Sequence, residues 1–212
     1  MPRTKLIINP DYYYFATARC SNREWFGLPM EDTWSLMSDY LFLLHHGFRF
    51  EIQAFVLLGN HIHMIVKAPK GNLSDGMAYF MRETSKAIGR ARGRINQIWG
   101  GPFHKSAITS TAHFRAVRRY LYRNPVEAGI VERIEQYEFS TLRTLLGLDR
   151  GIIPLGEDVH LFEHTEAELA WLNTPTAKHI TKAIRAGLRR REFQPPKKRS
   201  TNKPFEDHEL LE

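Results

Sequence analysis

Residues 48–68 constrain the fold more than any other stretch, because they form two apolar runs joined by a tight turn. Polar and apolar residues alternate through residues 48–58, FRFEIQAFVLL, and after Gly59-Asn60 the segment HIHMIVKA returns over residues 61–68. A two-residue turn of this kind joins antiparallel strands. The sequence therefore predicts a β-hairpin and an antiparallel sheet. The alternation predicts one apolar face, made of Phe48, Phe50, Ile52, Ala54 and Val56, opposite Arg49, Glu51 and Gln53.

The remaining elements complete an α+β pattern. We predict strands at residues 12–18 and after the loop that starts at residue 93, and helices at 31–46, from about Leu73, and from Thr111 to Asn124. Gly47 is expected to end the helix at 31–46, and Pro125 the helix that starts at Thr111. The order strand, helix, hairpin, helix, strand, helix indicates a ferredoxin-like (RRM-like) antiparallel sheet with helices packed on one face.

The composition divides the chain into two parts. Residues 1–148 carry the α+β pattern, whereas residues 149–212 form a helical and basic extension whose stretch QPPKKRSTNKP, residues 194–204, is predicted to be disordered. A single cysteine, Cys20, excludes an intrachain disulfide. No segment approaches 18 apolar residues, so we expect no signal peptide or membrane span and a cytoplasmic location.

His61 and His63 are the first candidates for a functional site. Residues two apart in a strand point to the same face, so both imidazoles lie opposite Ile62, Met64 and Val66, which line the core. Two neutral imidazoles can bind one divalent cation together with a further ligand. The alternative is a pair of half-exposed histidines that form hydrogen bonds across the sheet. The tight turn before them favours a ligand pair.

A second histidine pattern competes with this pair. His160 to His164 match the H-x-x-E-H spacing of inverted zinc peptidases. This match follows the linker and does not lie on a long buried helix. We interpret it as a coincidence.

The segment RRYLYRNPVEAGIV, residues 118–131, supplies the next candidates. Tyr120 and Asn124 are one helical turn apart and share a face, while Tyr122 points elsewhere. A structural alternative makes Asn124 an N-cap with Pro125 at the first helical position and Glu127 completing a capping box.

Basic residues indicate a polyanionic partner. The formal net charge is +7 and the pI is about 9.6. We predict nucleic-acid contacts from three groups of basic residues, namely Arg82, Lys86 and Arg90; Arg115, Arg118, Arg119 and Arg123; and Arg189, Arg190 and Arg191.

The combination of GNHIHMIV and YLYRNPVEAGIV resembles the REP-associated tyrosine transposases, which are single-tyrosine His-hydrophobic-His transposases. The likeness covers roughly residues 8–145 and includes FATARCSNREWF and YEFST. By position, it implies that His61 and His63 bind a metal, that Tyr120 is the nucleophile, and that Asn124 is a third ligand. The sequence departs from the family at Pro102, where such proteins commonly have an arginine.

The resemblance implies an enzyme that cleaves and rejoins single-stranded, hairpin-forming DNA through a 5′-phosphotyrosine, with Mg²⁺ or Mn²⁺. It also implies a bacterial, nucleoid-associated protein, and leaves monomer and homodimer open. Two alternatives remain at this point. One is a nucleic-acid-binding module without activity, and the other is a metal-dependent nuclease that uses water.

Overall fold

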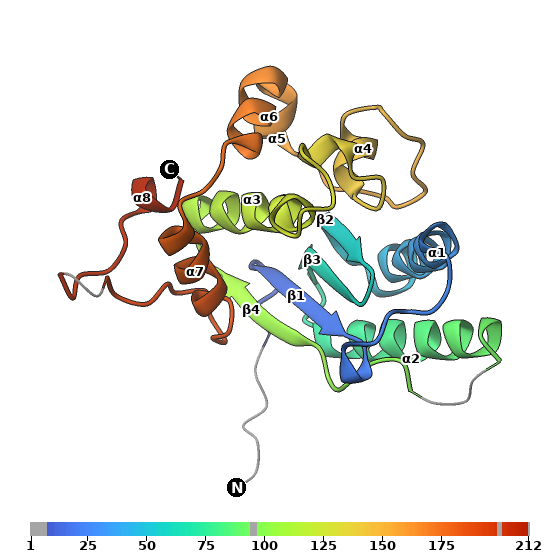
Figure 1. Cartoon of the computed structure of the whole chain (residues 1–212). Helices are drawn as coiled ribbons and strands as arrows, with labels where there is room; N and C mark the ends of the chain where they lie inside the picture. The colour runs from blue at the N-terminus through green and yellow to red at the C-terminus, as the bar shows by residue number, and fades with distance from the viewer. Residues whose placement is uncertain (1–7, 94–96, 199–200, 212) are drawn as a thin grey trace, which may run out of the picture.

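The predicted hairpin is present, and two further strands extend it into a sheet (Figure 1). The protein is represented by a computed structural model that describes residues 8–93, 97–198 and 201–211, without the side chains of residues 159 and 160. All neighbouring strands pair antiparallel, in the order β2-β3-β1-β4. The α+β class and the antiparallel sheet are therefore confirmed. The strands are β1 (Tyr13–Arg19), β2 (Glu51–Leu58), β3 (His61–Lys67) and β4 (His104–Ile108).

Helices α1 (Met30–Phe48) and α2 (Leu73–Ala91) lie between strands in the chain, and the remaining helices follow β4. The other longer helices are α3 (Thr111–Glu127), α6 (Thr165–Asn173) and α7 (Lys178–Gly187). The shorter ones are α4 (Thr141–Leu145), α5 (Val159–Glu163) and α8 (Asp207–Leu211), with the 3-10 turns η1 (Ser21–Arg23) and η2 (Ile134–Gln136). No helix in these described ranges is long and apolar enough to cross a membrane.

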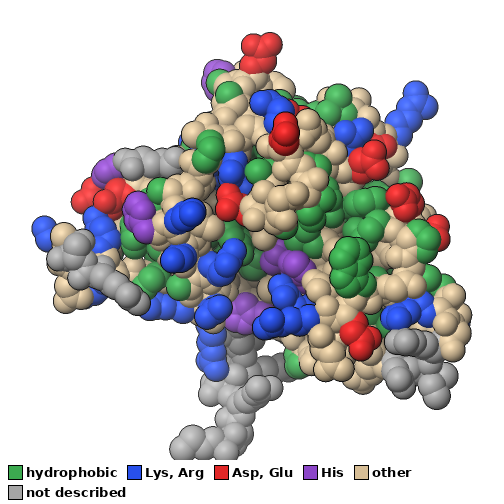
Figure 2. All heavy atoms as spheres, in the orientation of Figure 1, with side chains coloured by type: hydrophobic (Ala, Val, Ile, Leu, Met, Phe, Trp, Pro, Cys, Tyr) green, Lys and Arg blue, Asp and Glu red, His purple; other side chains and the backbone are tan. Residues whose placement is uncertain are grey.

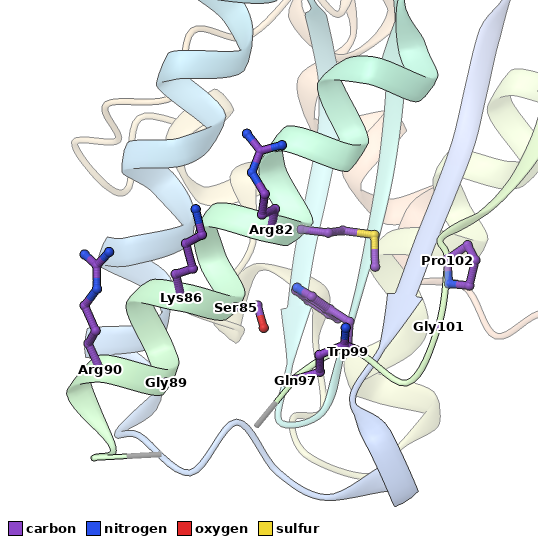
Figure 3. A pocket seen from close by; sticks show the side chains of 10 residues that line it. Arg82, Ser85, Lys86, Gly89, Arg90, Gln97, Trp99, Gly101 and Pro102 are labelled. Atoms are coloured by element: carbon purple, nitrogen blue, oxygen red, sulfur yellow. The ribbon is translucent and has the colours of Figure 1, made fainter. Parts of the chain in front are cut away.

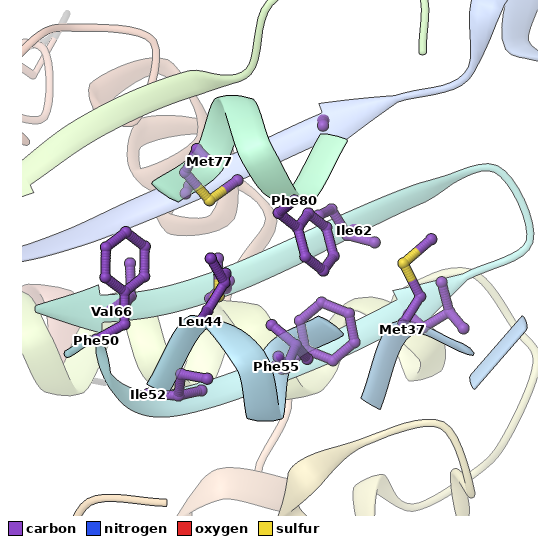
Figure 4. Close-up of a cluster of buried hydrophobic side chains, with 14 of the residues drawn as sticks. Met37, Leu44, Phe50, Ile52, Phe55, Ile62, Val66, Met77 and Phe80 are labelled. Carbon is purple, nitrogen blue, oxygen red and sulfur yellow. The ribbon is translucent and has the colours of Figure 1, made fainter. Parts of the chain in front are cut away.

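Helices cover both faces of the sheet, so the prediction of helices on one face only is wrong. Met37 and Leu44 of α1 and Phe80 of α2 pack with Ile62 and Val66 on one face (Figure 4). On the opposite face, Val117 and Leu121 of α3 pack with Phe15 and Ile65. The physical reason is that the central strands are apolar on both sides, and each side must be buried.

A β-bulge explains why β2 does not have the single apolar face predicted for it. The register of β2 against β3 shifts between Ile52 and Ala54. Before the bulge, Phe50 and Ile52 face α1 and α2, whereas after it Ala54 and Val56 face α3. One extra residue moves every later side chain to the other face.

The end of α1 also differs from the prediction. Gly47 lies inside the helix, which continues to Phe48. Arg49 then adopts the left-handed conformation, with φ of 59°, and its backbone N–H donates to the carbonyl of Leu44. An αL residue at this position satisfies a terminal carbonyl and ends the helix without a glycine.

The C-terminal extension packs against α3. Helices α6, α7 and α8 contact α3, and Glu192 forms a parallel bridge with Ala107 at the edge of β4. The tail predicted to be disordered is held in place over its described part, since Lys198 Nζ donates to both carboxylate oxygens of Glu209 at 2.6 and 2.9 Å. Residues 199 and 200 of that tail lie outside the described ranges. After this tail, the side chain of Leu210 in α8 is buried.

Candidate active site

Strand β3 presents the two histidines on the α3 face of the sheet. The ring centroids of His61 and His63 are 4.9 Å apart, with the rings almost perpendicular. Across the sheet, Arg19 of β1 is paired with His61, and Thr17 with His63. His63 is buried and His61 half-buried. The two rings therefore lie side by side, as the strand periodicity predicts.

The surroundings keep both histidines neutral at neutral pH. Burial, aided by the charge of Arg19, lowers the pKa of His61 to about 4. Burial, with the charges of His61, Arg19 and Arg185, lowers the pKa of His63 well below 6.5. Each ring therefore keeps a lone pair that a cation can use.

Hydrogen bonding also suits the pair to a metal. His61 Nδ1 lies 2.7 Å from Asn60 Oδ1, which can only accept, so Nδ1 carries the hydrogen and Nε2 keeps the lone pair. Nδ1 of His63 is buried and has no hydrogen-bond partner among the described residues. Within those residues, no group of three His, Cys, Asp or Glu side chains is arranged to hold a metal. The side chain of His160 is outside the described part, so the spacing of His160 and His164 stays untested.

Helix α3 places Tyr120 over the histidines. The ring centroid of Tyr120 is 6.2 Å from that of His63 and 6.3 Å from that of Phe15, whose ring stacks on His63 at 5.3 Å. Tyr122 is buried on another side of the helix, where burial raises its pKa to about 12. Only Tyr120 of these two lines the cavity described below.

Asn124 lies one turn after Tyr120, but the helix does not end there. Helix α3 continues through Pro125 to Glu127, so both the predicted end at Asn124 and the alternative N-cap role are wrong. Pro125 has no N–H to donate to the carbonyl of Leu121. Asn124 Nδ2 takes that place, donating to Leu121 O at 3.3 Å and to Tyr120 O at 2.7 Å. This leaves the amide oxygen of Asn124 as the atom available to a ligand.

His61, His63, Tyr120 and Asn124 line one open cavity of about 950 Å³. Its wall is strongly basic and includes Arg19, Arg23, Arg185 and Arg189, while His104 Nε2 donates to the carbonyl of Leu188 at 2.7 Å. In Figure 2, Lys and Arg side chains gather around histidines over α7 and the neighbouring strands. An anionic ligand fits this cavity.

Comparisons with known proteins agree with this arrangement. The chain is 35% identical over 106 residues to the REP-associated tyrosine transposase of Escherichia coli (strain K12). The chain is a relative of that transposase. The match spans 50% of this chain and 61% of the relative, so about two-fifths of the relative lies outside it. No family model matches the chain.

A solved structure shares the fold. It is described as the REP-associated tyrosine transposase bound to a REP hairpin, and it aligns with a TM-score of 0.56 and 28% identity. The alignment covers 75% of this chain and 93% of the other. The resemblance inferred from the sequence to the REP-associated tyrosine transposases is thus confirmed.

Three arginines of α3 do not face the cavity, which corrects their predicted role in nucleic-acid binding. Arg118 forms ion pairs with Asp158 and Glu168, and its side chain is 1% exposed. Arg119 and Arg123 are buried and donate to backbone carbonyls of the C-terminal extension. A phosphate cannot reach side chains that are already buried and bonded in this way.

Arg115 also contacts the extension. Its guanidinium pairs with Glu168 at 3.0 Å and lies 4.7 Å from the ring centroid of Trp171. The side chain remains 28% exposed, so its nucleic-acid contact stays a prediction.

The basic stripe of α2 lines a different cavity. Arg82, Lys86 and Arg90 border an open cavity of about 660 Å³, which Trp99 and Pro102 also line (Figure 3). Gly101 and Pro102 also border the cavity lined by His61 and His63, so the loop that carries them lies between the two cavities. Arg190 and Arg191 are exposed but line neither space.

Sequence reasoning missed Arg19, Asn60 and Arg185 as members of the site. The register of β1 against β3 would have indicated Arg19, since it is the partner of His61. Asn60 appeared only as a turn residue. Arg185 belongs to the basic run of the extension, which predicts added DNA affinity, but nothing in the sequence indicates that α7 reaches the sheet.

Proposed function

We propose that this protein cleaves and rejoins single-stranded DNA at hairpins, with Tyr120 as nucleophile. The observation that carries the proposal is that Tyr120 and Asn124 of α3 and the two histidines of β3, far apart in the sequence, line one basic cavity. The related transposase, whose solved structure contains a REP hairpin, supports DNA hairpins as the substrate. Such a protein would act on the bacterial chromosome in the cytoplasm, as a monomer or a homodimer.

The chemistry assigned to Tyr120 is a transesterification. Its phenolic oxygen attacks a backbone phosphorus and forms a P–O bond, while the bond from phosphorus to the 3′ oxygen breaks. The phenolic proton is lost, and the 3′ oxygen gains one and leaves as a hydroxyl. A 3′-hydroxyl can later attack the 5′-phosphotyrosine in reverse, so the energy of the phosphodiester is kept.

A divalent cation fits the residues present. His61, His63 and the amide oxygen of Asn124 would hold it, as two neutral imidazoles and one carbonyl-type oxygen. When bound, Mg²⁺ or Mn²⁺ polarises a phosphate and stabilises developing negative charge. Imidazole ligands suit Mn²⁺ better than Mg²⁺.

The basic wall of the cavity supplies affinity for the DNA backbone. Arg19, Arg185 and Arg189 are exposed and make no ion pair with any described residue. Cations without a carboxylate partner remain free to neutralise phosphates. Arg82, Lys86 and Arg90 would bind DNA further from the cleavage point.

A covalent-capture assay tests this proposal. Purified protein is incubated with a labelled single-stranded hairpin and Mn²⁺, and a denaturation-resistant adduct is measured. We expect an adduct with the wild type, none with His63→Ala, and the wild-type amount with His46→Ala, which changes an exposed histidine on α1. DNA affinity of His63→Ala should stay within several-fold of wild type, which shows that it has folded.

Two results would contradict the proposal. Product formed without any adduct would indicate a nuclease that uses water. Tight binding without cleavage or adduct would indicate a binding module.

A further inference from the structure

Trp25 is an exposed aromatic residue beside the cavity that the proposed chemistry leaves unused. Trp25 is 71% exposed, whereas Trp34, Trp99 and Trp171 are buried or half-buried. The residue after it, Phe26, is buried and packs edge-on against Trp99 at 5.4 Å. The loop is therefore anchored by Phe26, and the ring of Trp25 is held outside the core.

The ring lies next to the turn that precedes the histidines. A Cβ on Gly59 would be 3.0 Å from Cε3 of Trp25 and 3.2 Å from Cζ3, so the six-membered part of the ring lies close to Gly59. Most of the residue's surface is nevertheless open to solvent. A side chain at residue 59 would require the ring to shift by a few tenths of an ångström.

Hydrogen bonds tie this loop to the Gly59-Asn60 turn and connect it to His61. Phe26 N donates to Gly59 O at 3.0 Å, and Cys20 N donates to Asn60 O at 2.8 Å. Asn60 Nδ2 donates to Arg23 O at 2.8 Å, while its Oδ1 accepts from His61. One asparagine thus ties the loop that carries Trp25 to the candidate metal ligand.

The backbone of the same loop is strained. Asn22 and Arg23 are consecutive non-glycine residues with φ of 52° and 59°. Such conformations are sparsely populated and persist where surrounding structure enforces them, commonly at ligand sites.

A small polar cavity lies next to the ring. It measures about 140 Å³ and is bordered by Trp25, Asn22 and Arg92, among others. Cys20 and Asn22 also border the cavity of Tyr120, so the two spaces adjoin. A DNA strand that leaves Tyr120 over Asn22 would reach Trp25 next, with Arg23 and Arg92 placed to meet its phosphates.

We propose that Trp25 is a stacking platform for one unpaired base of the single strand that flanks the cleavage point. The inference rests on the proposed function. A flat aromatic surface stacks on any base, and arginines beside it neutralise the backbone, which is how single strands are held without sequence readout. A double-stranded stem has no unpaired base to offer and would gain nothing from this ring.

Equilibrium binding tests the platform independently of cleavage. Every variant carries Tyr120→Phe, so no covalent step contributes, and the affinity for a labelled hairpin with a single-stranded flank is measured by fluorescence anisotropy. Trp25→Ala should weaken binding by about 5- to 150-fold, the range for loss of one stacked base. Trp25→Phe keeps a ring and should lose less. Phe162→Ala, which removes an exposed ring on α5, is the matched control and should bind as its parent does.

Abasic substitutions in the flank then locate the contact. One position should weaken binding to the parent protein and have no further effect with Trp25→Ala. The platform is overturned if Trp25→Ala binds within twofold of its parent, or if its loss is equal for a blunt hairpin without a flank. Neither readout depends on an adduct, so failure of the tyrosine chemistry and failure of the platform are told apart.

Discussion

The two sides of α3 each carry a tyrosine, and the two tyrosines have opposite roles. One side presents Tyr120 and Asn124 to an open, basic cavity. The other buries Tyr122 in the core and joins Arg118 to Asp158 and Glu168 of the extension. A tyrosine is thus a candidate for function on one side of the helix and structural on the other. Burial and partners, rather than residue type, separate the two roles.

The largest effect is expected from removing the arginine on the buried side. Arg118→Ala leaves two buried carboxylates without their main partner and should lower the free energy of unfolding by about 3–5 kcal/mol. Arg189→Ala removes an exposed arginine and should change it by less than about 0.5 kcal/mol. Urea denaturation measures both. Equal changes in the free energy of unfolding of the two variants would contradict the structural role assigned to Arg118.

A pH titration sharpens the contrast on the buried side. Burial raises the pKa of Tyr122 to about 12, from an ordinary value of 10.0. Between these values the folded protein binds more protons than the unfolded chain, so this contribution to stability is present below pH 10 and is lost as the pH rises towards 12. Tyr122→Phe should therefore make the alkaline fall in the free energy of unfolding shallower, by about 1–3 kcal/mol. An unchanged slope in the variant would show that Tyr122 is not held in a desolvated site.

The smallest effect concerns the salt dependence of DNA binding. Arg185→Ala or Arg189→Ala should reduce the slope of log affinity against log salt by about 0.7 for each phosphate of a single strand that the variant no longer neutralises. Arg123→Ala, from the buried side of α3, should leave the slope unchanged among molecules that remain folded. Anisotropy titrations at several salt concentrations give these slopes. A reduced slope for Arg123→Ala alone would reverse our assignment.

Local patterns predicted the strands, the hairpin and the shared face of His61 and His63, because strand periodicity and turn type depend on residues that are close in the sequence. The Tyr120–Asn124 pair followed from helical spacing in the same way. The pattern could not show that Arg118 faces Asp158, since that contact joins distant segments. Nor could it show the bulge at Gln53 or the helix that runs through Pro125, where Asn124 replaces the missing donor. These features depend on tertiary packing.

The central claim is that Tyr120, and not its neighbour on the other side of the helix, is the nucleophile. Peptide mapping of a covalent complex formed on a single-stranded hairpin with Mn²⁺ tests this most directly. We expect the nucleotide on Tyr120, no adduct with Tyr120→Phe, and an adduct retained with Tyr122→Phe. A nucleotide mapped to Tyr122, or an adduct that survives Tyr120→Phe, would contradict the account.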